Sequence, residues 1–264
     1  MKKIKFGSTD LEVSSVILGL MRINNAKDPV AVLTTAIENG ITFFDHADIY
    51  GGGECESIFA DALAQTEYKR EDLFIQSKCG IVPGKMFDFS KEHIIKSVEG
   101  SLKRLKMDYL DALLLHRPDT LVEPEEVAAA FDELEKAGKV KYFGVSNQNP
   151  GQIELLKKYV SQPLLANQLQ FGIMHTGMID RGIHVNMTDS GSVDHDGGIL
   201  EYSRLNDMTI QAWSPYQYGF FEGVFIGNEK FPELNAKLEE LAEKYQTTAT
   251  GIASAWILRH PANM

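Results

Sequence analysis

Cysteine is scarce in this sequence. Only Cys55 and Cys79 occur among its 264 residues, too few for the disulfide framework that stabilises small secreted domains. This cysteine content fits a reducing compartment, and we expect a cytoplasmic protein.

Long apolar runs and an excess of basic residues are missing as well. No run approaches the roughly 20 apolar residues that span a bilayer, and the basic N-terminus lacks the apolar core of a signal peptide. Lysine and arginine total 26 against 37 aspartates and glutamates, which gives a formal net charge of −11. Such an acidic chain is a poor match for nucleic acid or an anionic membrane surface. We predict neither partner, and the composition indicates no particular oligomeric state.

A G-x-G-x-x-G turn after an early strand is also absent, which disfavours a doubly wound dinucleotide-binding fold. Instead, apolar strand-like runs and helix-like runs alternate along the whole chain, after a hairpin signal at residues 3–14. This alternation predicts one domain, residues 1–264, built on a parallel sheet that helices cover. We count about seven parallel strands, one fewer than a closed (β/α)8 barrel contains. The predicted strands are 16–21, 41–48, 72–80, 109–119, 140–147, 164–171 and 208–216, and the predicted helices are 27–40, 55–65, 90–106, 123–139, 149–160, 199–207, 232–246 and 248–260.

Polar side chains stand at the ends of most of these apolar strands. A single one marks only the start of a loop, but successive strands share the feature. The carboxyl ends of the strands form the active-site face of a β/α barrel, so we predict that these residues converge on one site. They are Asp45, Lys78, His116, Asn147, Gln168 and Ser214.

Residues 43–56, "FFDHADIYGGGECE", concentrate acidic, imidazole and phenol side chains. Side-chain alternation places Asp45 on one face of the strand and His46 and Asp48 on the other. Asp45 and His46 therefore cannot easily share a metal, and His46 with Asp48 alone makes a poor zinc site. We predict no metal, and we expect Asp45 to meet Lys78 at the equivalent height on the next strand.

Asp45, Lys78 and Tyr50 together favour proton chemistry. A tyrosine pKa of about 10 is too high for acid–base work at neutral pH. A nearby ammonium lowers that pKa, and a buried carboxylate keeps the ammonium charged. His116 would then orient or polarise a substrate oxygen. The alternative is a buried salt bridge without a catalytic role; we favour catalysis because lysine and aspartate are rarely buried without a reason.

These residues, in this order and on these elements, resemble the aldo-keto reductase family, in particular its bacterial members. The likeness extends through the whole chain, and its segments are specific as a set. They are "FFDHADIYG", "QSKCG", "LLLHRPD", "FGVSN", "NQLQF" and "AWSPY".

The resemblance implies a (β/α)8 TIM barrel whose bottom the initial β-hairpin closes. It also implies an NADPH-dependent oxidoreductase that reduces aldehydes or ketones to alcohols by hydride transfer. Tyr50 would be the general acid, Lys78 and Asp45 the pair that tunes it, and His116 the residue that positions the carbonyl oxygen.

For the cofactor, the resemblance implies that Ser146, Asn147 and Gln168 hydrogen-bond the nicotinamide carboxamide. Trp213 would stack on the nicotinamide ring, and Ser214 would lie near the pyrophosphate. The alternative role of Trp213 is core packing. The alternative for Ser146 and Gln168 is that they are polar residues at strand ends whose hydrogen bonds are satisfied within the protein. NADPH is the family expectation, and NADH is not excluded.

The sequence departs from the family at its C-terminus. It stops at "HPANM", where the eighth strand is due and where residues that grip the adenosine 2′-phosphate normally follow. We therefore predict a barrel without its eighth strand and C-terminal segment, whose open edges are prone to aggregation. We expect either that the natural protein continues past Met264 or that this chain is functionally compromised.

Residues 175–198 form a long, polar, glycine-rich stretch, which we predict to be a loop that acts as a lid or sets specificity. Its histidines and aspartates fit no compact metal site by their spacing. Phe220, Phe221 and Phe225 either cover the cofactor or pack on the barrel.

Two further functions remain as alternatives. A cofactor-binding sensor or regulatory subunit on the same barrel would keep the catalytic residues, so only turnover distinguishes it from an enzyme. A different barrel enzyme, such as a sugar-phosphate isomerase, would need an ordered phosphate site and a carboxylate base in place of Tyr50. The substrate depends on loop shapes, which the sequence does not determine.

Overall fold

The computed structural model describes residues 1–264. The chain divides into two compact units, residues 1–167 and residues 168–264, and each is described by itself. None of its helices has both the length and the apolar composition of a membrane span.

A seven-stranded sheet forms the framework, with the strand order β11-β10-β9-β8-β5-β4-β3. The neighbouring pairs from β3 to β9 all run parallel. This sheet with its helical cover confirms the predicted TIM-barrel-like fold with seven parallel strands. The strands are β3 (Ile17–Gly19), β4 (Phe43–Asp45), β5 (Phe74–Cys79), β8 (Leu110–Leu115), β9 (Val140–Ser146), β10 (Leu164–Gln170) and β11 (Thr209–Trp213).

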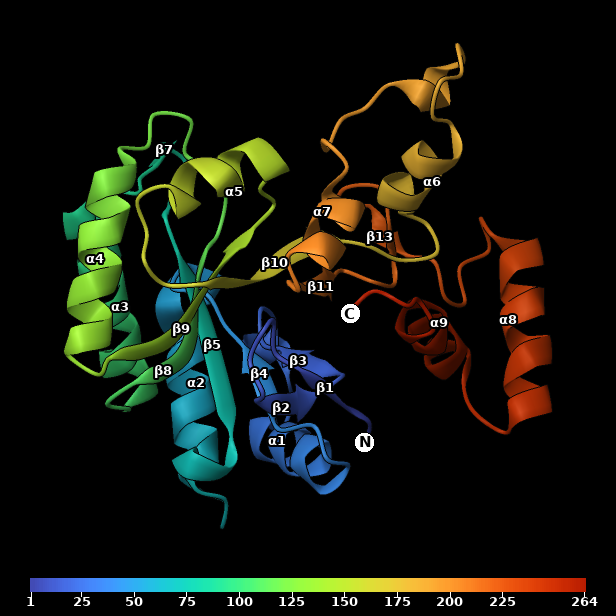
Figure 1. The fold of residues 1–264 in the computed structure, drawn as a ribbon. Coiled ribbons are helices and arrows are strands. Elements are labelled where there is room, and N and C mark those ends of the chain that lie inside the picture. The colour runs from blue at the N-terminus through green and yellow to red at the C-terminus, as the bar shows by residue number, and fades with distance from the viewer. The chain divides into compact units, whose positions relative to one another are not determined.

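Helices follow the strands of the first unit one by one, and Figure 1 shows α3 and α4 side by side against its strands. Two of them, α1 and α3, begin within two residues of the predicted starts at residues 27 and 90. The Asp28 side chain accepts a hydrogen bond from the Ala31 N–H at the start of α1, and Ser90 accepts one from His93 N–H at the start of α3, which satisfies N–H groups that have no partner within the helix. The helices are α1 (Pro29–Glu38), α2 (Glu54–Leu63), α3 (Lys91–Leu105), α4 (Pro124–Lys136) and α5 (Pro150–Lys157), with the short 3-10 helices η1 (Ile23–Asn25), η2 (Tyr50–Gly53) and η3 (Arg70–Asp72).

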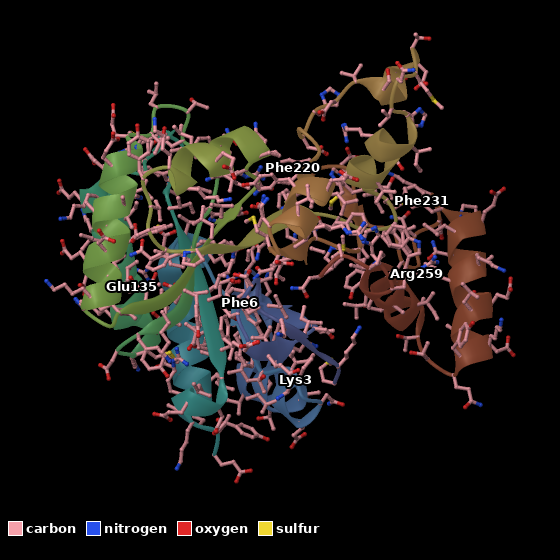
Figure 2. All side chains as sticks on the ribbon, in the orientation of Figure 1. Lys3, Phe6, Glu135, Phe220, Phe231 and Arg259 are labelled. Carbon is pink, nitrogen blue, oxygen red and sulfur yellow. The ribbon has the colours of Figure 1, made fainter.

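The N-terminal hairpin closes the amino end of the strands in the first unit, as predicted. Strands β1 (Lys3–Lys5) and β2 (Glu12–Ser14) pair antiparallel. Phe6, labelled in Figure 2, is fully buried, and its ring centroid lies 6.1 Å from that of Phe43 and 5.1 Å from that of Phe74. Burial of one such ring stabilises a fold by about 1.5–3 kcal/mol. Gly7 has a φ of +57°, and a Cβ there would lie 2.7 Å from the Leu165 carbonyl oxygen, so the tight approach of the hairpin requires glycine.

The second unit has a smaller core of its own. Helices α8 (Pro232–Tyr245) and α9 (Ala249–Leu258) pack together (Figure 1), and Phe225, Leu238 and Ala253 are buried. The Ile210 N–H donates to the Asn263 carbonyl at 2.9 Å. Asn263 therefore lies beside β11 without forming a strand with it.

The prediction of an irregular loop at residues 175–198 is wrong in part. The stretch contains α6 (Gly177–Ile183) and the short η4 (Ser190–Ser192), and α7 (Ile199–Leu205) follows. Aspartates stabilise the remaining turns, because Asp189 accepts from Gly191 N–H, and Asp194 accepts from Gly197 N–H. Turns that such side-chain bonds stabilise show no apolar periodicity, so the hydrophobic pattern of the sequence did not reveal them.

Two small antiparallel hairpins were also missed. They leave the sheet after β5 and β11, and strands of two residues are too short to show an alternation. They are β6 (Ile81–Val82) with β7 (Met86–Phe87), and β12 (Gln217–Tyr218) with β13 (Gly223–Val224).

Candidate active site

The carboxyl ends of β4, β5 and β8 bring the predicted catalytic residues together within the first unit. Asp45 ends β4, Lys78 is the last residue but one of β5, and His116 follows β8 directly. Tyr50 opens η2, five residues after Asp45, and its N–H donates to the Ala47 carbonyl at 3.0 Å. The strand ends therefore position three of the groups, and a tight turn positions the fourth.

Lys78 and Asp45 form a buried ion pair. The Lys78 ammonium donates to Asp45 Oδ1 at 2.8 Å and to Oδ2 at 2.7 Å. The Lys78 side chain is 0% exposed and that of Asp45 is 10% exposed. Such a pair is costly to desolvate, and removal of one partner leaves an uncompensated buried charge.

The predicted equal height of these two residues is wrong. Asp45 pairs in register with Gln76, and Lys78 pairs with Leu114 of β8. Side chains two residues apart on a strand share a face, so the long Lys78 side chain reaches back to Asp45 from one pleat further along β5.

Two further groups bind the ion pair, the Gln76 side chain and the backbone carbonyl of His46. Neither was predicted from the sequence. Gln76 Nε2 donates to Asp45 Oδ1 at 2.6 Å, and Lys78 Nζ donates to the His46 carbonyl at 2.6 Å. Gln76 lies two residues before Lys78 on the same predicted strand, so the two side chains share a face. This spacing was the available signal that Gln76 belongs to the site. The two side chains that donate to Asp45 therefore both come from β5.

The turn that carries Tyr50 depends on its glycines. Gly51, Gly52 and Gly53 have φ values of 58°, 66° and 97°, a left-handed conformation that costs other residues about 1–2 kcal/mol each. A Cβ at Gly53 would also lie 2.9 Å from Arg104 Cδ. The glycine run thus lets the chain reverse from the end of β4 into α2 with Tyr50 over the ion pair.

Lys78 and Tyr50 influence each other's protonation. The Lys78 nitrogen lies 4.9 Å from the centroid of the Tyr50 ring. Burial raises the pKa of the Tyr50 phenol, and the nearby Lys78 lowers it without cancelling that rise. The sequence predicted the lowering by Lys78 but not the larger opposing effect of burial. For Lys78, burial lowers the pKa, but Asp45 and Tyr50 raise it and leave it above its usual value.

His116 is held as a neutral imidazole. Its ring meets the Tyr50 ring edge to face, with centroids 5.9 Å apart and an interplanar angle of 81°. Burial, followed by the charges of Lys78 and Arg117, lowers the pKa of His116 to about 2. Its Nδ1 is buried and has no hydrogen-bond partner. A neutral ring offers one N–H donor and one acceptor.

His46 and Asp45 do face opposite ways, as predicted from alternation. The His46 ring packs edge to face on Phe59 of α2, with centroids 4.6 Å apart. No group of three or more histidine, cysteine, aspartate or glutamate side chains is arranged to hold a metal.

Ser146 and Asn147 lie at the end of β9, in the first unit. Ser146 is buried. Asn147 Nδ2 donates to Ser146 Oγ at 2.7 Å and to the His116 carbonyl at 3.4 Å. Asn147 has a φ of 57°, which is uncommon for a residue other than glycine.

Gln168, Trp213 and Ser214 lie in the second unit. Gln168 Nε2 donates to Gln211 Oε1 at 2.9 Å. The Trp213 ring is partly buried and stacks on Phe221, with centroids 6.2 Å apart and planes at 20°. Ser214 has a φ of 48°, a strained conformation that clusters at functional sites.

The amino-acid sequence also matches a known protein family and several known oxidoreductases. The model of the aldo/keto reductase family matches residues 15–264. The uncharacterized oxidoreductase YcsN of Bacillus subtilis (strain 168) is 37% identical over 279 residues, which cover 100% of this chain and 86% of that protein. The 6-dehydroglucose reductase of Agrobacterium fabrum is 34% identical over 272 residues, with coverages of 97% and 84%.

A solved structure shares the fold. The crystal structure of the thermostable aldo-keto reductase Tm1743 with the inhibitor epalrestat matches with a TM-score of 0.77 and 30% sequence identity. The match covers 99% of this chain and 87% of that one.

Proposed function

The chain belongs to the aldo/keto reductase family of oxidoreductases, and from this premise we propose that it uses NADPH to reduce a small aldehyde or ketone to an alcohol. In this proposal Tyr50 is the general acid, Lys78 and Asp45 tune it, and His116 orients the carbonyl oxygen. The observation that carries the proposal is the buried Lys78–Asp45 pair, with the Lys78 nitrogen 4.9 Å from the centre of the Tyr50 ring.

Tyr50 has the protonation state that a proton donor needs. Because burial raises the pKa of its phenol, the hydroxyl keeps its proton at neutral pH. When negative charge develops on the substrate oxygen, the phenol donates that proton. The Lys78 ammonium then stabilises the phenolate that remains, and Asp45 keeps the ammonium charged.

His116 suits a role in orientation. With its pKa lowered to about 2, the ring is neutral at any pH at which the protein would work. A neutral imidazole donates a hydrogen bond to the carbonyl oxygen without placing a second cation beside Lys78.

The residue types at the predicted cofactor positions fit a nicotinamide. Side-chain amides both donate and accept hydrogen bonds, so Asn147 and Gln168 complement a carboxamide, as does the Ser146 hydroxyl. The indole of Trp213 offers an aromatic face, and Ser214 is proposed near the pyrophosphate. When bound, the cofactor supplies the hydride, and these residues hold and orient it.

Strained backbone supports the same assignment. Left-handed φ values at Asn147 and Ser214 each cost about 1–3 kcal/mol and persist where surrounding structure enforces them. Both residues directly follow barrel strands, at the ends that carry the active site in this fold.

We include oxidised sugars among the candidate substrates, because the name of the 34% identical relative is 6-dehydroglucose reductase. NADPH rather than NADH is the expectation that the family supplies. A cofactor-binding sensor with negligible turnover is the alternative, and the same experiment distinguishes the two.

The test combines binding and turnover. Fluorescence titrations with NADPH and with NADH measure affinity, and NADPH oxidation is followed with a panel of aldehydes, ketones and oxidised sugars. We expect tighter binding of NADPH and steady turnover with at least one carbonyl class. Tight binding without turnover would favour the sensor, and absence of binding to either cofactor would refute both functions.

A further inference from the structure

A second buried charged cluster lies on the opposite face of β5 from the catalytic pair. Glu56, in the first turn of α2, is 0% exposed. Its Oε1 accepts a hydrogen bond from Ser77 Oγ at 2.7 Å, and its Oε2 accepts one from Arg104 Nε at 2.8 Å. Arg104 Nη2 lies 2.8 Å from the same oxygen. One carboxylate therefore joins α2, β5 and α3.

The cluster connects β5, which carries Lys78, to α2, which directly follows the turn of Tyr50. Ser77 precedes Lys78 on β5, and neighbouring side chains of a strand point to opposite faces. Ser77 thus anchors the back of the strand at the point where Lys78 leaves its front. Glu56 lies just beyond the turn of Tyr50, because α2 begins directly after η2.

Arg104 also packs against that turn. A Cβ on Gly53 would lie 2.9 Å from both Cδ and Nε of Arg104, so the arginine side chain rests on the backbone that follows Tyr50. Asp48, two residues before Tyr50, donates its N–H to the Lys78 carbonyl at 3.0 Å. Bonds on both sides of Tyr50 therefore lead to β5.

An ion pair alone does not explain the whole arrangement. A buried carboxylate needs a cation to offset its desolvation, and Arg104 supplies that. The additional bond from Ser77 to Glu56 contributes a link between α2 and the strand of Lys78. Such a link acts on geometry, and a displacement of about 1 Å in an active site can cost about 100-fold in rate.

We propose that Glu56 is a positioning residue, which through its hydrogen bond with Ser77 holds the Lys78 ammonium at its working position beside Tyr50. The inference rests on the proposed function, because it assigns Glu56 to the same proton transfer. Glu56 contacts neither substrate nor cofactor in this proposal.

Two serines of the same cluster provide a matched pair of variants. Ser77→Ala removes the bond between Glu56 and the strand of Lys78 and leaves the Glu56–Arg104 pair intact. Ser101→Ala is the control, since Ser101 is equally buried and accepts a bond from Arg104 Nη2 at 3.3 Å, but it lies on α3. We expect kcat to fall about tenfold in Ser77→Ala, with KM and the NADPH Kd within about twofold, and to stay within about twofold in Ser101→Ala. Ser77→Thr keeps the hydroxyl and should restore kcat.

A measurement that needs no turnover tests the same position. In protein labelled with 13C at tyrosine Cζ, the Tyr50 resonance is assigned by its absence in Tyr50→Phe. Its chemical shift depends on the nearby Lys78 charge, so we expect it to move in Ser77→Ala and to stay in place in Ser101→Ala. If the wild-type protein reduces no carbonyl, the proposed function fails, but this readout still decides the positioning role.

The inference is overturned if both alanine variants keep wild-type kcat and the wild-type Tyr50 resonance and differ only in unfolding midpoint. Should Ser77→Ala not fold, Glu56→Asp replaces it. That variant keeps the charge opposite Arg104 and withdraws the carboxylate by one methylene. Loss of kcat with a displaced Tyr50 resonance supports the positioning role, and wild-type values of both refute it.

Discussion

The two ends of the strands in the first unit each bring together a carboxylate, a cation and a phenol, in different surroundings. At the amino end, Arg70 Nη2 lies 2.6 Å from Asp111 Oδ2, and the guanidinium carbon of Arg70 lies 4.0 Å from the Tyr109 ring centroid. Lys141 Nζ lies 3.7 Å from that centroid on a side chain that is 47% exposed. Asp111 also accepts the Ile75 N–H at 2.9 Å. These contacts fasten strand starts to one another.

At the carboxyl end, the cation is a lysine with no exposed side-chain surface. Lysine is a compact charge whose proton affinity responds to burial, whereas arginine stays protonated. Burial also raises the pKa of Tyr50 and lowers that of His116. The comparison teaches that the residue types do not mark a catalytic site by themselves. A buried, titratable cation beside a phenol with a displaced pKa makes the carboxyl end the candidate site.

The largest expected contrast is in turnover. Tyr50→Phe removes the proposed proton donor and keeps the ring, so kcat should fall by about 10³-fold, within the usual range for general acid catalysis, while the NADPH Kd changes less than about twofold. Tyr109→Phe is the matched control at the amino end and should keep kcat within about twofold. Steady-state kinetics with one good carbonyl substrate measure both. Similar kinetics for the two variants would contradict the placement of proton transfer at the carboxyl end of the strands.

The next contrast is in stability. Lys78→Met removes the cation and leaves the Asp45 carboxylate buried, which should lower the free energy of unfolding by about 3–5 kcal/mol. Lys141→Met removes a half-exposed cation and should cost less than about 1 kcal/mol. Urea unfolding of the two variants measures the difference. Equal losses would mean that the carboxyl-end pair is no more strongly coupled than the exposed one.

The smallest expected effect is on the pH dependence of the free energy of unfolding. Burial, and then the charge of Lys78, lowers the pKa of His46 to about 3, whereas the ordinary value is about 6.5. The unfolded chain therefore binds the additional proton between these values. The stability is fully present above about pH 6.5 and falls as the pH drops toward 3, by about 1.4 kcal/mol per pH unit.

His46→Phe should remove this dependence, because phenylalanine fills a similar volume against Phe59 and does not titrate. Urea unfolding of both proteins over a pH series from about 7 to about 5 gives the free energies, and their difference isolates His46 from other titrating groups such as Asp48. Parallel curves would show that His46 is not held neutral by the fold.

Much of the fold and of the candidate active site was predictable. The starts of α1 at Asp28 and of α3 at Ser90 follow from capping residues, and the strands follow from apolar runs. The convergence of Asp45, Lys78 and His116 follows from the parallel order of their strands. The roles of the proposed cofactor residues stay predictions.

Other features required contacts between distant segments. The pairing of Asp45 with Gln76 instead of Lys78 depends on strand register, which a single strand does not encode. The direction of the Tyr50 pKa depends on how much of the protein covers the phenol. The link from Glu56 to Ser77 joins residues that no local pattern relates.

The sequence by itself determined the order of the elements, the ends of several helices and the chemical groups at the strand ends, because side-chain periodicity and capping act over a few residues. Only the tertiary structure decided the register of β4 on β5, the neutral state of His116 and the buried cluster of Glu56 on the opposite face of β5 from Lys78. Those properties arise from burial and from hydrogen bonds between segments that are far apart along the chain.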